Sequence, residues 1–229
     1  MPQPSLLTPP FAVSDAHQRI LAAAEDLFAE RGYDAVSMHA IATRAGMCKA
    51  NVFHHFTSKN ALYIAVLRQA CRDSDENLHK LEGTHLPFAQ RLAGFAREHL
   101  SHVLERHKVS RLIQREMLHS DPGRAQEMAE KIFGDKFQRL VAVLREGRER
   151  GELRADVDPA MVATLLIGAN VFFFEARDLL CHFPDVSFAA DPDRYSRHLV
   201  DILLRGILPA ETIPAETILT KPDAEKSSA

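Results

Sequence analysis

Four side chains that can contact DNA lie within seven consecutive residues. Lys49, Asn51, His54 and His55 bring an ammonium, an amide and two imidazoles to the second of two short predicted helices. Such groups bond phosphate oxygens, and an amide can also pair bidentately with adenine. This combination is typical of a helix that reads bases and phosphates in the major groove.

The residues around this cluster have the layout of a helix-turn-helix. The segment 37–59 predicts a short helix, a turn at Gly46, a second short helix and a polar break before another apolar helix. Gly46 supplies the left-handed conformation that ends a helix, and the small side chain of Ala42 allows the second helix to cross closely. Ser37 is placed to cap the first helix of the pair. The segment therefore predicts a DNA-binding element.

Residues inside the motif and on either side of it form a wider pattern. They are Arg19 to Ala24, Leu27-Phe28, Gly32-Tyr33, Ile41-Ala42, Ala45-Gly46, Phe53 to Phe56, Ser58-Lys59 and Ala61-Leu62. From Ser14 to about Ser74 this pattern resembles the DNA-binding domain of the TetR family of transcriptional regulators, and it is far more specific than one short motif. The resemblance implies a three-helix DNA-binding domain at 14–74, with the helix-turn-helix at 37–56.

The resemblance also implies roles for single residues. Cys48 stands where the family usually has a capping serine, and a thiol caps poorly. Phe53 replaces a usual tyrosine, so its ring can pack on the sugar-phosphate chain but cannot hydrogen-bond a phosphate. His55 and Lys59 match positions that contact the DNA backbone, and His39 matches one that reaches a base or phosphate. The expected DNA contacts are Ser37, His39, Lys49, Asn51, Phe53, His54, His55 and Lys59. The alternative for His39, Lys49 and His54 is an ordinary solvated side chain.

Composition is that of a cytoplasmic protein. The chain has 229 residues and a formal net charge of -3, but the window 44–68 contains four cations and no Asp or Glu. Such a local basic face is sufficient to meet phosphates. Three scattered cysteines suit reduced thiols, the start lacks a basic leader region, and no stretch is expected to have the apolar length of a membrane span. We expect no membrane association.

No motif for catalysis is found in the chain. A nucleophile elbow, a phosphate loop and a two-histidine metalloprotease helix are all missing from the sequence. We therefore expect neither an enzyme nor a cofactor, metal or catalytic residue.

Apolar periodicity after the motif predicts an all-α protein. Ser14 and Ser58 are expected to cap the first and fourth helices, and Asp158-Pro159 to start a later one. Further helices are predicted at 88–106, 109–119, 122–150, 160–180 and 192–208. Residues 1–13 and 209–229, which contain several prolines, are predicted to be a disordered arm and tail. By the resemblance, 75–208 is a larger C-terminal domain for effector binding and dimerisation.

The last two predicted helices carry wide apolar stripes. Val162, Leu165 and Phe173 belong to the first stripe, and Leu199 and Ile202 to the second. Their width exceeds what one packing partner needs. The resemblance implies that they pair with a second copy, so that a homodimer reads a palindromic operator. The alternative is that both stripes belong to the core of one subunit.

An effector pocket among the middle helices is implied by the resemblance. Candidate lining residues combine apolar bulk with polar groups: Phe95, His99, His102, Leu112, Arg115, Glu116, Phe133, Phe137, Asn170, Phe173, Phe174 and Arg177. The phenylalanine run at 172–174 favours a small hydrophobic or amphipathic effector of unknown identity. For each candidate, a role in the core or on a solvated face is the alternative.

These features predict a ligand-responsive repressor that an effector releases from its double-stranded DNA operator. Three alternatives remain at this point. The protein could be an architectural DNA binder without an effector. It could sense a metal through His99 and His102, which are three residues apart, or oxidation through Cys48.

Overall fold

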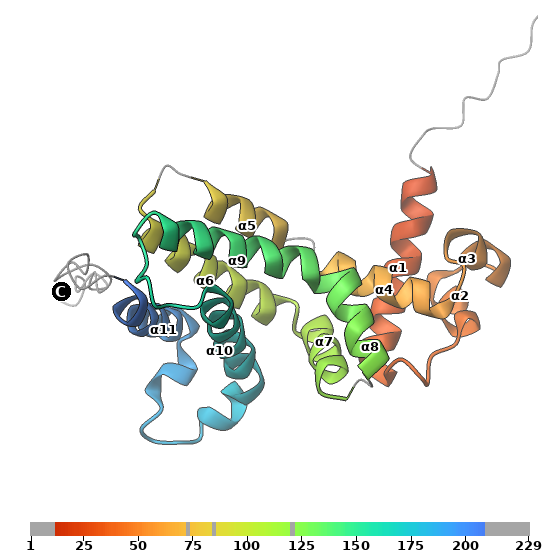
Figure 1. The fold of residues 1–229 in the computed structure, drawn as a ribbon. Coiled ribbons are helices and arrows are strands. Elements are labelled where there is room, and N and C mark those ends of the chain that lie inside the picture. Colours follow the sequence, from red (N-terminus) through yellow and green to blue (C-terminus); the bar gives the residue numbers. More distant parts are fainter. Residues whose placement is uncertain (1–11, 72–73, 84–85, 120–121, 209–229) are drawn as a thin grey trace, which may run out of the picture. The chain divides into compact units, whose positions relative to one another are not determined.

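All the described elements of the protein are helices, as the sequence predicts (Figure 1). The computed structural model describes residues 12–71, 74–83, 86–119 and 122–208. The predicted tail at 209–229 and most of the predicted N-terminal arm lie outside these residues. The chain divides into two compact units: unit 1 comprises 1–72 and 106–133, and unit 2 comprises 73–105 and 134–229.

Unit 1 contains the predicted helix-turn-helix. Its helices are α1 (Ala12–Arg31), α2 (Met38–Ala45), α3 (Lys49–His55), α4 (Lys59–Ala70), α7 (His107–His119) and α8 (Pro122–Met128), followed by a π-helical turn at Ala129–Phe133. Each of these helices contributes at least one apolar residue to a shared core, the short α3 through Val52. The helix-turn-helix therefore rests on a core that includes α7 and α8.

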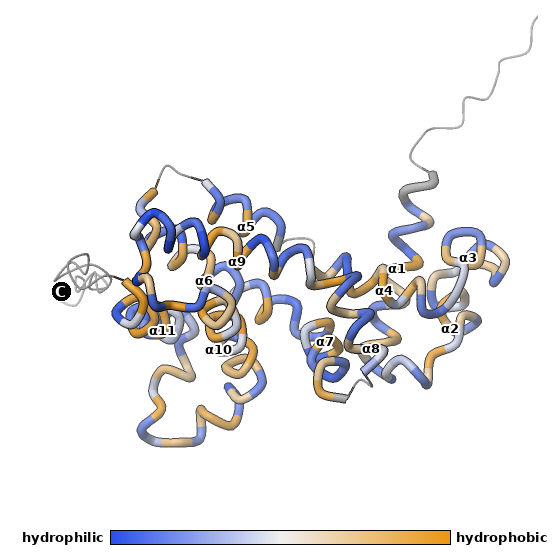
Figure 2. Tube along the Cα trace, viewed as in Figure 1, coloured by the Kyte–Doolittle hydropathy of each residue, from blue (hydrophilic) through white to orange (hydrophobic). Residues whose placement is uncertain are grey.

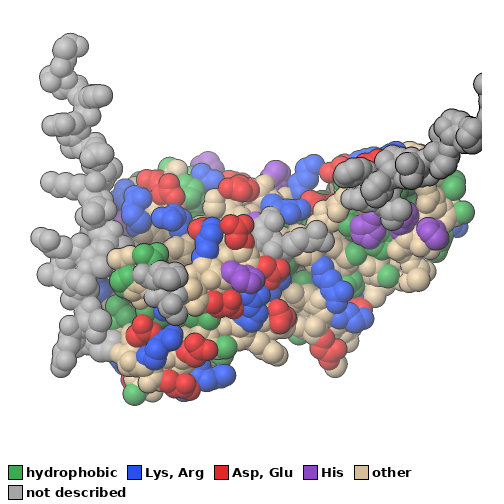
Figure 3. All heavy atoms as spheres, turned by 90° about the horizontal axis from the view of Figure 1, so that it is seen from above, with side chains coloured by type: hydrophobic (Ala, Val, Ile, Leu, Met, Phe, Trp, Pro, Cys, Tyr) green, Lys and Arg blue, Asp and Glu red, His purple; other side chains and the backbone are tan. Residues whose placement is uncertain are grey.

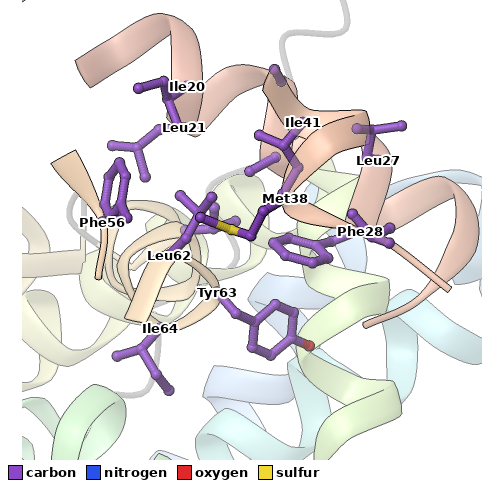
Figure 4. Packing of buried hydrophobic residues seen from close by; sticks show 14 of the residues in the cluster. Ile20, Leu21, Leu27, Phe28, Met38, Ile41, Phe56, Leu62, Tyr63 and Ile64 are labelled. Carbon is purple, nitrogen blue, oxygen red and sulfur yellow. The ribbon is translucent and has the colours of Figure 1, made fainter. Parts of the chain in front are cut away.

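The core of unit 1 forms where the apolar faces of α1, α2 and α4 meet (Figure 4). Ile20, Phe28, Ile41 and Leu62 are completely buried, and so is Tyr63. Residues spaced three and four apart on α1 lie on one face of the helix, so its periodic pattern yields one continuous apolar surface. Burial of this surface fixes the helices that carry α3.

Unit 2 is a second helical bundle. It consists of α5 (Ser74–Glu82), α6 (Phe88–Glu105), α9 (Gly134–Glu149), α10 (Pro159–Leu180), a short 3-10 helix (Ser187–Ala190) and α11 (Pro192–Ile207). Leu92, Leu144, Leu166 and Leu204 bring α6, α9, α10 and α11 into one core. Asp158 caps α10 by accepting hydrogen bonds from two backbone amides of its first turn, so the predicted start of this helix is confirmed.

The structure differs from the predicted helix and domain boundaries at several places. Helix α1 begins at Ala12, so Ser14 lies inside its first turn and does not precede the helix. The single helix predicted at 122–150 is interrupted by the π-helical turn, whose i→i+5 bonding departs from the i→i+4 pattern of an α-helix. The predicted division at residue 74 also differs from the compact units, because α7 and α8 pack with α1 and α4.

Helix α10 is apolar over most of its length (Figure 2). Among the described helices it is long and apolar enough to cross a membrane, by length and composition only. The expectation that no stretch would have this property was wrong for α10. The cause is that one face carries buried residues such as Val162 and Phe173, while another carries exposed ones such as Leu165 and Phe172.

Candidate DNA-binding site

The first helix of the motif is fixed at both ends by its own sequence. The hydroxyl oxygen of Ser37 accepts a hydrogen bond from the amide of Ala40 at 3.1 Å, which confirms the predicted cap. Gly46 has φ 66°, and its N–H donates to the carbonyls of Ala42 and Thr43. A residue with a side chain would be strained in this conformation. The turn therefore sets the angle at which α3 leaves α2.

The second helix, α3, turns most of its polar side chains outward. Val52 is completely buried and seats the helix on the core. Lys49, Asn51 and Phe53 are exposed, and the Lys49 ammonium lies 5.6 Å from the centre of the Phe53 ring. Cys48 stands at the N-cap position in an extended conformation and makes no side-chain cap bond, as expected for a thiol. An exposed cation, an amide and an aromatic ring thus share one short helix.

Histidines continue this surface at the end of α3. His54 is exposed, and its ring centre lies 5.5 Å from that of His55. His55 is half-buried and lies 6.0 Å from His17 of α1, whose ring stacks on Phe56 at 4.8 Å. Figure 3 shows histidine side chains gathered over the part of the molecule that carries α1 to α3. The packing against α1 holds the end of the helix in place.

The start of α4 is anchored to the turn that follows α1. Ser58 caps α4 by accepting the amide of Ala61 at 3.0 Å, as predicted. The Lys59 ammonium donates to the carbonyl oxygens of Tyr33 at 3.0 Å and Asp34 at 3.4 Å, and lies 4.2 Å from the Tyr33 ring centre. Two of its three N–H groups are thereby used inside the protein. Its contact with a phosphate stays a prediction.

The charges around the motif are not equally available to DNA. Arg44 belongs to the predicted basic window, but it pairs with Glu30 at 3.3 Å and Asp26 at 4.0 Å. Lys49 has no recorded ion pair within the described part of the chain. His39 is exposed on α2 and adds a side chain that can donate a hydrogen bond. The phosphate contact predicted for Lys49 stays a prediction.

Sequence reasoning missed two residues of α1 that position the motif. Arg19 donates to the carbonyl oxygen of Ala45 at 2.7 Å, next to the turn, and His17 packs on α3 as described. Both contacts join segments that are far apart in the sequence. Local periodicity gives no signal for them, beyond placing both residues on the helix that packs against the motif.

Two family models match the chain. The model described as "Bacterial regulatory proteins, tetR family" matches residues 20–66, which contain α2 and α3. The model described as "Tetracyclin repressor-like, C-terminal domain" matches residues 89–176. The chain belongs to the TetR family. Together the two models cover more than half of its length, and they bear out the resemblance found in the helix-turn-helix.

Curated relatives of this TetR-family chain are regulators. The transcriptional activator FasR of Mycolicibacterium smegmatis is 40% identical over 74 residues, or 28% of this chain. That alignment spans 34% of FasR, so it concerns only about a third of the relative. The transcriptional regulator UidR of Escherichia coli is 26% identical over 164 residues, which are 65% of this chain and 74% of UidR. The chain is thus similar to helix-turn-helix transcriptional regulators.

A solved structure shows the same fold over both units. The transcriptional regulator FadR of Bacillus subtilis, in complex with stearoyl-CoA, covers 83% of this chain and 98% of its own, with a TM-score of 0.68 and 19% sequence identity. At this identity the likeness establishes the fold alone. The TetR-family architecture, with an N-terminal helix-turn-helix and a helical C-terminal region, is therefore present here.

The twelve candidate effector residues divide between the two units. Leu112 and Phe133 belong to the core of unit 1 or pack against it, and Glu116 accepts a hydrogen bond from Arg124 at 3.0 Å. Arg115 is exposed in the same unit. The other eight lie in unit 2. In unit 1 the structure thus assigns packing or ion pairing to three of the four candidates.

In unit 2, several candidates meet around one buried amide. Asn170 of α10 is completely buried, and its Nδ2 donates to the carbonyl oxygen of Ala96 at 2.9 Å and lies 3.1 Å from Nδ1 of His99. Burial, with a smaller effect of His102, lowers the pKa of His99 to about 4, so this imidazole is neutral at pH 7. Its ring stacks on Phe95, with centres 6.1 Å apart.

The remaining candidates of unit 2 pack nearby or at its edge. The completely buried ring of Phe173 stacks on Tyr195 of α11, with centres 3.9 Å apart. Arg177 donates to the carbonyl oxygen of Ala189 at 3.1 Å, Phe137 packs against the core, and Phe174 is half-buried. No three His, Cys, Asp or Glu side chains among the described residues come together as a metal site, so His99 and His102 lack a third ligand there.

Proposed function

We propose that this TetR-family regulator is a homodimeric repressor, which occupies a palindromic operator and leaves it when a small hydrophobic or amphipathic effector binds unit 2. The exposed face of α3 carries the DNA-binding part of this proposal. It presents Lys49, Asn51, Phe53 and His54 on a helix that is seated by Val52 and aimed by the Gly46 turn. Lysine and histidine suit phosphates, whereas the amide of Asn51 can select a base.

An apolar stripe on α10 supports the homodimer. Met161, Leu165, Phe172 and Leu179 recur at helical spacing, and each side chain is more than half exposed. Ile202 of α11 is 69% exposed. A contiguous apolar surface of this kind is typical of a protein–protein interface. A second copy related by a two-fold axis would cover it and would place two α3 helices on an operator with matching symmetry.

The buried amide of Asn170 supports an effector in unit 2. Within the described residues its Oδ1 has no hydrogen-bond partner, whereas its Nδ2 is fixed by the Ala96 carbonyl. An unsatisfied buried acceptor costs about 1–3 kcal/mol, which a ligand donor would recover. The ring of Phe95 stacks on His99, which lies beside this amide, and Phe173 follows Asn170 by three residues on α10. FadR, which shares the fold, was solved with stearoyl-CoA, a molecule of the proposed amphipathic class.

Selection of bound DNA from a random pool tests the proposal. The purified chain is expected to recover a palindrome, to bind it as a dimer, and to lose affinity steeply with added salt. Enrichment of no sequence, in the presence and absence of stearoyl-CoA, would contradict a sequence-specific regulator.

Release of the selected operator tests the effector. Stearoyl-CoA is expected to raise the dissociation constant, and coenzyme A without the acyl chain serves as the matched control. Equal effects of both compounds would show that the acyl chain is not what unit 2 recognises.

A further inference from the structure

Arg124, in the first turn of α8, is held by polar partners from three helices. Its side chain is 15% exposed, and it donates to Glu116 of α7 and to Glu127 of α8 at 3.0 Å each. It also donates to the side-chain oxygen of Asn60, the second residue of α4. Asn60 in turn donates to Glu127 at 3.0 Å. Hydrogen bonds from Lys131 and Asn60 lower the pKa of Glu127 to about 2, so this carboxylate stays charged.

Two aromatic rings also lie against Arg124. Its guanidinium carbon lies 4.7 Å from the ring centre of Tyr63 and 5.0 Å from that of Tyr33. Tyr63 is completely buried and meets Phe28 edge-on, with ring centres 4.8 Å apart (Figure 4). It meets Tyr33 edge-on at the same distance. The ring of Tyr33 also carries the Lys59 ammonium. A partly desolvated cation over such rings is attracted by their negatively polarised faces.

These contacts hold the part of α4 that is joined directly to α3. Only residues 56–58 separate His55, the last residue of α3, from Lys59, the first of α4. Within this connection Phe56 is 6% exposed and Ser58 is bound to the α4 amide that it caps. Little conformational freedom is left between the two helices. A displacement of Asn60 is therefore passed on to the exposed side chains of α3.

We propose that Arg124 is a positioning residue for DNA recognition. Together with Asn60, Glu116, Glu127, Tyr33 and Tyr63 it forms the Arg124 cluster, which sets where α3 stands relative to the core of unit 1. The inference rests on the proposed function, because it assigns a role in reading DNA. It is new in placing that role on α7 and α8, beyond the residues 20–66 that the DNA-binding family model matches.

Glutamine at position 124 removes the cation while retaining a polar side chain. Arg124→Gln leaves Glu116 and Glu127 without their shared partner and removes the stacking on both rings. The matched control is Arg106→Gln, which breaks the 3.2 Å ion pair between Arg106, in the turn before α7, and Glu25 of α1 in the same unit. A second variant, Asn60→Ala, removes the α4 amide that bonds Arg124 and Glu127, and it keeps the Arg124 charge. This variant still tests the inference if Arg124→Gln does not fold.

Operator binding, random-DNA binding and amide exchange are measured on the full chain well below its melting midpoint. Arg124→Gln and Asn60→Ala are each expected to weaken operator binding about tenfold, while binding to random DNA changes less than about twofold. Without DNA, amide exchange in α3 and at the start of α4 is expected to accelerate. Combining both variants should cost less than the sum of the single losses, because they share one contact. Arg106→Gln is expected to lower stability and leave operator binding unchanged.

Wild-type operator affinity in Arg124→Gln, with unchanged exchange in α3, would overturn the inference and leave Arg124 a purely stabilising residue. Equal losses on operator and random DNA would overturn it as well, because a misplaced α3 costs base recognition first. Failure of the proposed function gives a different result, because the wild-type chain then selects no operator. Amide exchange in Arg124→Gln still decides in that case whether Arg124 positions α3.

Discussion

The cap of α3 offers a test of how well its local sequence supports the recognition helix. Cys48 has φ -77° and ψ 153°, an extended conformation like those of Ser37 and Ser58, yet only the two serines make cap bonds. Cys48→Ser places a hydroxyl where the first turn of α3 has amides to satisfy. A serine cap is worth about 0.5–2 kcal/mol. The amide of Asn51 already donates to the Cys48 carbonyl at 3.1 Å, so we expect the lower half of that range.

Chemical unfolding followed by circular dichroism measures this gain. The expected increase of about 0.5–1 kcal/mol corresponds to about 1–4 °C in the melting midpoint of a chain of this size. Ser37→Cys and Ser58→Cys are the matched controls, and each should lose about 1 kcal/mol. A stability of Cys48→Ser equal to or below that of the wild type, with the expected losses in both controls, would refute the reasoning for α3.

Three further predictions concern the DNA contacts, the dimer and the acid response. Lys59→Ala is expected to weaken binding to operator and random DNA alike, and to reduce the slope of log affinity against log salt by about one. Asn51→Ala should cost about 1–3 kcal/mol of binding free energy on the operator alone. A loss of affinity for Lys59→Ala at an unchanged slope would mean that Lys59 only anchors the turn at Tyr33. Leu165→Glu should give a monomer by light scattering, whereas Leu118→Glu, which changes a leucine that is 76% exposed in unit 1, should not. Because the pKa of His99 is lowered to about 4, the unfolded chain takes up the His99 proton at a higher pH than the folded chain does, and the stabilisation present above pH 6.5 is lost as the pH falls towards 4. Urea titrations should show that the wild type loses up to about 2 kcal/mol of unfolding free energy between pH 7 and pH 5, and that His99→Gln does not. Identical pH profiles of the two proteins would contradict the burial argument.

Local signals in the sequence were sufficient to predict most of the helices. Ser37, Gly46, Ser58 and Asp158 mark helix ends because caps and left-handed glycines act within a few residues of themselves. The exposed face of α3 follows from amphipathic spacing around Val52 in the same way. These features depend on neighbouring residues, which a single sequence displays directly.

Contacts between residues far apart in the sequence could not be predicted from such local signals. Arg124 and Asn60 are 64 residues apart, and no spacing rule joins them. For Lys59 the motif favoured a phosphate, while the structure adds two carbonyl partners that only the folded turn brings near. The π-helical turn at Ala129–Phe133 escaped prediction because its apolar residues fit an ordinary helix equally well. Among the effector candidates, composition could not separate the residues of one unit from those of the other.

The interrupted course of the chain through unit 1 has a consequence for its synthesis. The unit takes its residues from 1–72 and again from 106–133, and Leu112, Met128 and Ile132 belong to its core. A nascent chain that has emerged only as far as residue 72 would expose the apolar surface that these side chains cover. We therefore expect the DNA-reading unit to reach its native stability only after residue 133 has left the ribosome. A fragment cut at the end of α4 should be prone to aggregation, although it contains the whole helix-turn-helix.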